Sequence, residues 1–306
     1  MRQMLLDVWR RASNGSGNRA ARVIALAACV LPGVVPTGVL ASDHGDTALL
    51  RSLQRHDARI TDLFAFIRSE NLVLAVCLDP TVPEGATEYV FPPDLTLRIS
   101  IDTHSEVRFD DPDDVAVLGG TVAEPGRIAA DVEFEFRFGR RHRPDLKVRG
   151  LPGRVKKEID LFIGLRDDPF IRGPRIGRNV AALVLQLPAA EMVEAHGTIL
   201  VWATSKIPEV HGSQVDLAGR GLRNQFPENE AMNLLSPRDH LDKLGVMPDV
   251  LIFDTSHSAS FPNGRDLADD VVDLVGDPRP LANDAPFPST NDVPFLDDFP
   301  YLAPPQ

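Results

Sequence analysis

The stretch Asp131-Val132-Glu133-Phe134-Glu135-Phe136-Arg137-Phe138 alternates apolar and charged residues without interruption. Successive side chains of a β-strand point to opposite faces of the sheet, so this pattern places Val132 and three phenylalanines on one face and the charges on the other. A strand that is buried on one face and solvated on the other is typical of antiparallel sheets. We therefore expect a β-rich domain around this strand.

Other stretches have strand length and strand composition. Residues 95–101 also alternate, and short apolar runs occur at 58–66, 72–78, 159–165, 179–187, 198–204 and 250–253. Turn-forming or charged stretches such as 110–114 and 140–144 separate some of them. We predict short helices at 189–195 and 239–244, and a helix at 265–275 whose apolar stripe recurs at helical spacing. The sequence thus predicts a mainly β fold, an antiparallel β-sandwich with a few short helical insertions.

The first 41 residues have the layout of a secretory signal. Arg19 and Arg22 precede an apolar run at 23–35, and Val39-Leu40-Ala41 precedes the expected cleavage point. The apolar run is too short for a membrane span, so we expect no transmembrane segment in the mature chain. We predict an exported protein, periplasmic or extracellular, with one β-rich domain at 42–275. The segment 276–306 holds eight prolines and spaced aromatic residues, and we expect it to wrap over the body.

The mature chain is strongly acidic and holds one cysteine. Cleavage after Ala41 leaves 27 basic and 43 acidic residues, a net charge of −16. This balance argues against a nucleic-acid partner and favours cations, although it also serves solubility. Cys77 alone rules out an internal disulfide and a cysteine-rich zinc site, and its apolar neighbours indicate a buried structural thiol.

The order of several short motifs resembles an exported bacterial family called domain of unknown function 4331. The motifs include Ser42-Asp43-His44, the stretch 61–66, Arg-Asp-Asp-Pro-Phe at 166–170, Gly-x-Asn-Val at 177–180 and Val-Trp-Ala-Thr at 201–204. Further matches are 214–216 with 219–220, 248–251 with Asp254, 263–271, and the ending 299–304. Members usually continue the histidine with an Arg-Glu-Ala-Pro-like sequence, where this chain has Gly45-Asp46-Thr47-Ala48. The resemblance implies export and a shared fold, and no activity.

The new N-terminus offers a candidate metal site. Cleavage after Ala41 would make His44 the third residue, and a free amine, two amides and the imidazole can then surround Cu(II) or Ni(II) in a plane. Alternatively, Asp43 and His44 bond neighbouring loops and bind no metal.

Carboxylates offer a second candidate, a calcium site. Asp43, Asp46 and Asp62, joined by Asp254 or Asp269, would supply the hard oxygen ligands that calcium prefers. No EF-hand loop is present, so the fold would have to assemble this site. In the alternative interpretation, Asp62 caps a turn.

Two further polar groups are predicted to be structural. Arg166 can hold Asp167 and Asp168 and so fix a loop, while acid–base chemistry by the two neighbouring aspartates is the alternative. Asn263 begins a turn, and Arg265 would pair with an acidic residue of the following helix.

The sequence contains no Gly-x-Ser-x-Gly, no His-Glu-x-x-His and no phosphate-binding loop. Our leading hypothesis is a non-enzymatic β-rich protein that binds a ligand, a metal or a partner outside the cytoplasm. The alternatives are a metal-dependent hydrolase with Asp and His ligands and a structural protein that interacts with the cell envelope.

Overall fold

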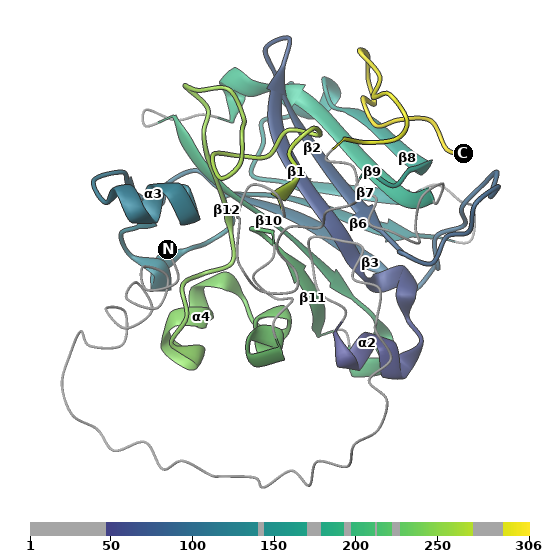
Figure 1. The fold of residues 1–306 in the computed structure, drawn as a ribbon, viewed down its shortest axis with the longest axis horizontal. Coiled ribbons are helices and arrows are strands. Elements are labelled where there is room, and N and C mark those ends of the chain that lie inside the picture. The colour runs from purple at the N-terminus through teal and green to yellow at the C-terminus, as the bar shows by residue number, and fades with distance from the viewer. Residues whose placement is uncertain are drawn as a thin grey trace, which may run out of the picture.

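The computed structural model describes residues 47–139, 144–169, 179–192, 197–211, 213–221, 227–271 and 290–306. Two antiparallel sheets pack against each other, and short helices lie at their ends and edges (Figure 1). This arrangement confirms the predicted antiparallel, sandwich-like β fold. Within the described residues, no helix combines the length and the apolar character that crossing a membrane requires.

The first sheet has four strands. Their order is β1 (Ile60–Arg68), β2 (Asn71–Leu78), β9 (Asn179–Pro188) and β8 (Asp160–Asp167), all antiparallel. The two central strands are buried on both faces, with Leu72 through Leu78 almost fully covered. This double burial explains why they appear in the sequence as continuous apolar runs without alternation.

The second sheet contains the alternating strand. Its order is β11 (Gln214–Ala218), β10 (Thr198–Lys206), β3 (Thr96–Asp102), β6 (Val132–Phe138) and β7 (Pro144–Arg149), with β12 (Leu251–Asp254) also paired to β10. Strand β6 directs Phe134, Phe136 and Phe138 into the core between the sheets. The other face of the sheet carries Glu133 and Glu135 with their arginine partners. A two-stranded ribbon, β4 (Val107–Arg108) and β5 (Thr121–Val122), is hydrogen-bonded to neither sheet, but its valines pack on residues of β10, β11 and β12.

The helices are short. They are α2 (Ala48–Leu53), η1 (His56–Ala58), α3 (Pro112–Leu118), η2 (Pro125–Arg127), η3 (Val155–Lys157), η5 (Ala189–Glu191), η6 (Pro208–Val210), η7 (Pro227–Leu234) and α4 (Pro237–Leu244). Helix α4 confirms the helix predicted at 239–244, and the described part of 189–195 forms only the 3-10 turn η5. The stretch 110–114, predicted to be a charged loop, instead begins α3, because the Asp111 carboxylate accepts the N–H groups of Asp113 and Asp114.

The helix predicted at 265–275 is wrong for its described part. Residues 265–271 form a bridge and turns, of which only the last has helical geometry. The Asp269 carboxylate accepts the N–H groups of Phe261 (2.9 Å) and Asp266 (2.8 Å), which closes a compact loop. The apolar spacing is real, since Leu267 and Val271 are buried, but it arises from a loop that packs on a sheet.

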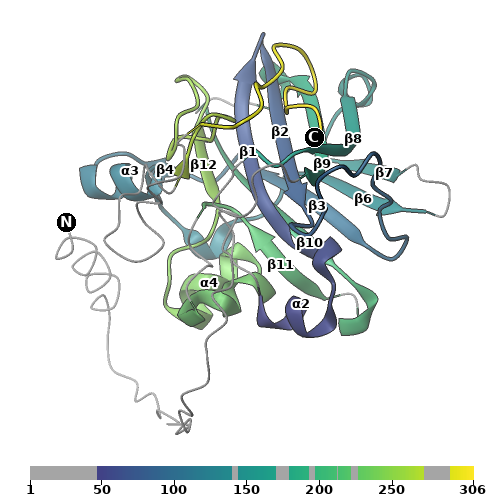
Figure 2. The same ribbon diagram turned by 45° about the vertical axis from the view of Figure 1, so that its right-hand side comes forward.

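The described part of the C-terminal segment packs on the outer face of the four-stranded sheet. Tyr301 and Leu302 lie on Phe66 and its neighbours, with Phe295 and Phe299 packed around them. The Tyr301 hydroxyl also donates a hydrogen bond to Gln186 of β9 (2.5 Å). Figure 1 and Figure 2 both show this segment, in yellow, crossing the sheet near β8 and β9.

Candidate functional site

Asp62, the first predicted calcium ligand, lies in a buried ion pair. Its Oδ1 accepts a hydrogen bond from Arg265 Nη2 (3.1 Å), and both side chains have at most 1% exposure. The guanidinium lies 4.2 Å from the centroid of the Phe64 ring. Arg265 therefore pairs with a strand residue far away in sequence, and the predicted pairing with its own helix is replaced by this contact.

Asp254 and Asp269 serve separate turns. Asp254 accepts hydrogen bonds from the backbone and hydroxyl of Ser256 and lies 3.1 Å from His257 Nδ1. Burial opposes ionisation of Asp254, but the bonds from Ser256 and His257 outweigh it and lower its pKa. Asn263 holds the same turn, because its Oδ1 accepts the Asp254 N–H (2.7 Å).

The predicted carboxylates thus do not converge. Asp62, Asp254 and Asp269 are each engaged by different donors, and the described residues contain no group of three His, Cys, Asp or Glu side chains suited to a metal ion. Asp43, His44 and Asp46 lie outside the described residues. The copper or nickel chelate at the mature N-terminus therefore stays a prediction.

The stretch 166–168 fixes the C-terminal segment. Asp167 accepts hydrogen bonds from Asn291 Nδ2 (2.8 Å) and Gln306 Nε2 (2.7 Å), so in the described chain these amides take the place expected for Arg166. Burial raises the pKa of Asp167 to about 6, against the effect of the two amide donors. Arg166 lies over the Phe162 ring at 3.9 Å, and burial lowers its pKa. Asp168 is also buried.

A second buried polar centre was not singled out from the sequence. The fully buried Asp216 of β11 accepts the Ile60 N–H (2.8 Å), and burial raises its pKa to about 7. Nearby, Asp249 accepts the Arg220 N–H (2.7 Å) and donates its own N–H to His240 Nδ1 (3.1 Å).

This buried centre is held in one arrangement. His240 Nε2 lies 3.1 Å from the Met232 carbonyl, so the ring contacts the backbone through both of its nitrogens. Gly219 has no room for a side chain, since a Cβ there would lie 2.4 Å from the Asp249 carbonyl oxygen. Three of the motifs noted in the sequence meet at this centre: 214–216, 219–220 and 248–251. Their presence was the sequence signal that could have indicated it.

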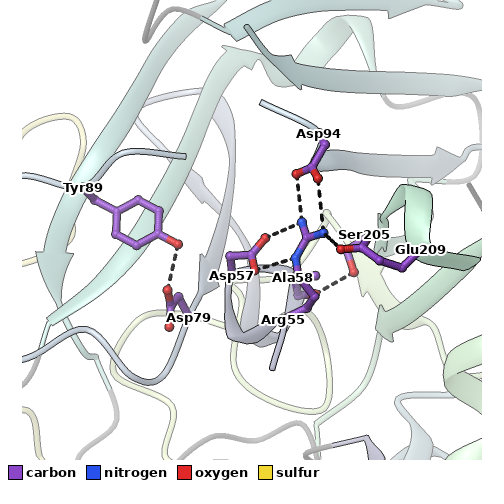
Figure 3. A network of polar contacts seen from close by, with 8 residues as sticks. All are labelled: Arg55, Asp57, Ala58, Asp79, Tyr89, Asp94, Ser205 and Glu209. Atoms are coloured by element: carbon purple, nitrogen blue, oxygen red, sulfur yellow. Dashed lines mark hydrogen bonds and ion pairs between the residues drawn. The ribbon is translucent and has the colours of Figure 1, made fainter. Parts of the chain in front are cut away.

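An accessible polar cluster lies around Arg55, and we call it the Arg55 network (Figure 3). Arg55 binds Asp57 through two hydrogen bonds of 2.9 Å, Asp94 at 3.0 Å and Glu209 at 2.5 Å. Arg55 and Asp57 flank the start of η1, Asp94 precedes β3, and Glu209 lies in η6. The network therefore joins the segment before β1 to two connections between strands, β2–β3 and β10–β11. Loops at the ends of a β-sandwich commonly carry binding residues.

The network carries excess negative charge that solvent can reach. One guanidinium faces three carboxylates, and the side chains of Asp94 and Glu209 are 46% and 37% exposed. The hydrogen bond to Asp57 contributes most to raising the pKa of Arg55, while a bond to its own backbone and the bond from Arg55 lower the pKa of Glu209. Both shifts keep the groups charged at neutral pH.

Tyr89 and Asp79 border the network (Figure 3). The Tyr89 hydroxyl donates to Asp79 Oδ2 (2.8 Å), and burial together with Asp79 raises the tyrosine pKa far above neutrality. General acid–base catalysis works best with a pKa near the working pH. The geometry is therefore suited to electrostatic binding of a cationic group.

No family model, curated protein or solved structure matches this chain.

Proposed function

We propose that this chain is an exported, non-enzymatic binding protein whose Arg55 network receives a cationic group of a partner outside the cytoplasm. Export is supported by the signal-like residues 1–41 and by the resemblance to the exported family described above. The single observation that carries the binding function is the Arg55 network, an accessible cluster with three carboxylates and one guanidinium. The same acidic balance extends over the predicted mature chain.

The internal guanidinium gives the network its selectivity. Arg55 fixes the directions of Asp57 and Asp94 through two contacts to each, so the exposed carboxylates of Asp94 and Glu209 are presented from a pre-ordered frame. A pre-ordered charged surface loses less side-chain entropy on binding than a mobile one. An amine or guanidinium of a partner fits this arrangement, because its positive charge balances the negative charge that Arg55 alone leaves uncompensated.

The binding function can be tested with a lysine-rich hexapeptide as the probe, by calorimetry at low and moderate salt. Asp94→Asn with Glu209→Gln preserves side-chain shape and removes both excess charges. We expect this variant to bind the probe roughly tenfold more weakly, with a weaker dependence on salt.

The matched control is Asp110→Asn with Glu124→Gln, which removes two exposed acidic charges elsewhere. Equal weakening of the control would show a nonspecific charge effect and contradict the proposal, as would failure of the natural chain to bind the peptide. Mass spectrometry of protein recovered from the producing cells tests the export step. A mature chain that begins at Ser42 supports it, and an intact N-terminus in the cytoplasm contradicts it.

A further inference from the structure

Positive charge is concentrated in one short part of this acidic chain. Residues 137–157 contain nine Lys and Arg residues and one acidic residue, whereas the remainder contains 23 basic and 43 acidic residues. Positions 140–143 lie outside the described residues. The other six basic residues define what we call the basic surface: Arg137, Lys147, Arg149, Arg154, Lys156 and Lys157.

The fold gathers these residues around the edge strand β7. Arg149 is paired in register with Glu133, and Lys147 with Glu135, so both basic side chains lie on the outer face of the six-stranded sheet. Val148 points the opposite way and packs on the core. All six residues of the basic surface are exposed.

The 3-10 turn η3 adds its charges along the same edge. Lys156 Nζ donates a hydrogen bond to the Val148 carbonyl (2.8 Å), which fixes η3 beside β7. Lysines on an edge strand also discourage unwanted strand pairing. Protection of the edge would explain the basic residues on β7 itself, but it does not explain Lys157, which lies after the strand in η3.

Ion pairs across and along the strands hold the arginines of this face in place. Arg149 binds Glu133 (2.9 Å) and Arg137 binds Glu135 (2.9 Å). The bond from Arg98 contributes most to lowering the pKa of Glu135. Lys147 and Lys157 take no part in these ion pairs, so they can be replaced without breaking them.

The composition of the basic surface indicates the kind of partner. Interfaces between proteins usually have an apolar or aromatic centre. None of the exposed large apolar side chains of the described chain belongs to β7 or η3; they are Leu53, Val90, Phe109, Leu234 and Leu296. A partner of this surface would therefore be recognised through charge alone.

The arrangement of charge also favours a flat partner. The acidic segment around Asp111 and Asp113 lies at α3, on the opposite side of the molecule from β7 in both views (Figures 1 and 2). A flat anionic surface that touches β7 need not approach that segment, whereas a flexible polymer can reach both. Exposed acidic residues also lie nearer: Asp145 on β7, Glu158 beside Lys157, and Glu84 and Glu88 in the loop whose Phe91 stacks on Phe138. Contact therefore centres on the Arg149 end.

We propose that the basic surface docks the protein on anionic lipid headgroups. Each exposed base near such a surface strengthens binding about fivefold. Glu133 and Glu135 offset much of the charge of Arg149 and Arg137, so reversible attachment rests mainly on Lys147, Lys156 and Lys157. This inference does not depend on the Arg55 network. Attachment would leave the opposite, acidic side of the protein facing solvent.

The test uses the mature chain and sedimentation with vesicles of phosphatidylcholine containing 30% phosphatidylglycerol, on the order of the anionic content at which such binding is measured. Lys147→Gln with Lys157→Gln should weaken binding about 25-fold. The control, Arg127→Gln with Lys243→Gln, removes two exposed basic charges elsewhere and should leave binding within about twofold. Pure phosphatidylcholine vesicles should not bind.

Three outcomes would overturn the proposal. They are no binding to the anionic vesicles, equal weakening in the control, and binding to soluble polyphosphate or an oligonucleotide without binding to vesicles. The Asp94→Asn, Glu209→Gln variant separates this proposal from the preceding one, since it should lose peptide binding and keep vesicle binding.

Discussion

Two ion pairs join strand β1 to the same loop, and they differ mainly in burial. Asp62 pairs with Arg265 at 3.1 Å with side-chain exposures of 0% and 1%, whereas Arg68 pairs with Asp266 at 3.3 Å with exposures of 45% and 29%. Both arginines also lie over a phenylalanine of β1. The chemistry is the same, so the comparison isolates what the surroundings contribute.

The buried pair is held by the backbone as well. Arg265 and Ala65 exchange two hydrogen bonds of 3.0 and 3.1 Å, so the loop is attached to the edge of β1 directly beside the guanidinium. Gly264 makes this approach possible, with a positive φ of 64° and a Cβ position only 2.8 Å from the Ala65 carbonyl oxygen. Loss of either charged group would therefore leave its partner enclosed, with no simple route to water.

The largest expected effect comes from Arg265→Met. This change leaves the Asp62 carboxylate buried without its cation, and we expect a loss of about 3–5 kcal/mol in the free energy of unfolding. Urea denaturation followed by circular dichroism measures the loss. The double change Asp62→Leu with Arg265→Met should lose less than Arg265→Met alone, because it removes both buried charges. A double variant as unstable as the single one would show that packing, and not charge, dominates here.

A buried carboxylate without an arginine sharpens the comparison. Asp167 is enclosed by the amides of Asn291 and Gln306, and burial raises its pKa to about 6 from 3.8, with Asp292 adding to the rise. The folded state therefore holds a proton more tightly than the unfolded state. The resulting stabilisation is complete below about pH 4 and is lost as the pH rises through about 6.

Asp167→Asn should remove this pH dependence. Between pH 4 and pH 7 the natural chain should lose on the order of 2–3 kcal/mol relative to the variant. Urea denaturation at both pH values measures the difference in slope, which is insensitive to any constant cost of the asparagine. Parallel curves for the two proteins would mean that the amide donors fully stabilise the ionised carboxylate.

The sequence predicted the sheets better than the loops, for a physical reason. Strand β6 is recognisable in the sequence because one of its faces is buried and the other carries charges. The central strands are recognisable as continuous apolar runs. Strand β7 was missed, since Leu146 and Val148 are only half-buried and charged residues alternate with them. The helix expected at 265–275 is wrong over residues 265–270, because an apolar spacing indicates burial but not the conformation that produces it.

The candidate site was less accessible to sequence reasoning. The assignment of Arg166 and Arg265 as structural rested on residue type, but their partners depend on which segments the topology brings together. Asp62 and Arg265 are 203 positions apart, and Asp167 and Gln306 are 139 apart. The Arg55 network likewise joins residues from three segments that are distant in sequence, and no local motif predicts that contact.

The smallest expected effect comes from the exposed pair. Arg68→Gln removes the same type of charge from the same two segments as Arg265→Met, but water solvates both Arg68 and Asp266 when they separate. We expect a loss of about 0–1 kcal/mol in the free energy of unfolding, and less in 0.5 M salt than in 0.02 M salt, because mobile ions screen exposed charges. Urea denaturation at the two salt concentrations measures both effects. A loss close to that of Arg265→Met would contradict the conclusion that burial separates the two pairs, because the two changes alter equivalent contacts between β1 and one loop.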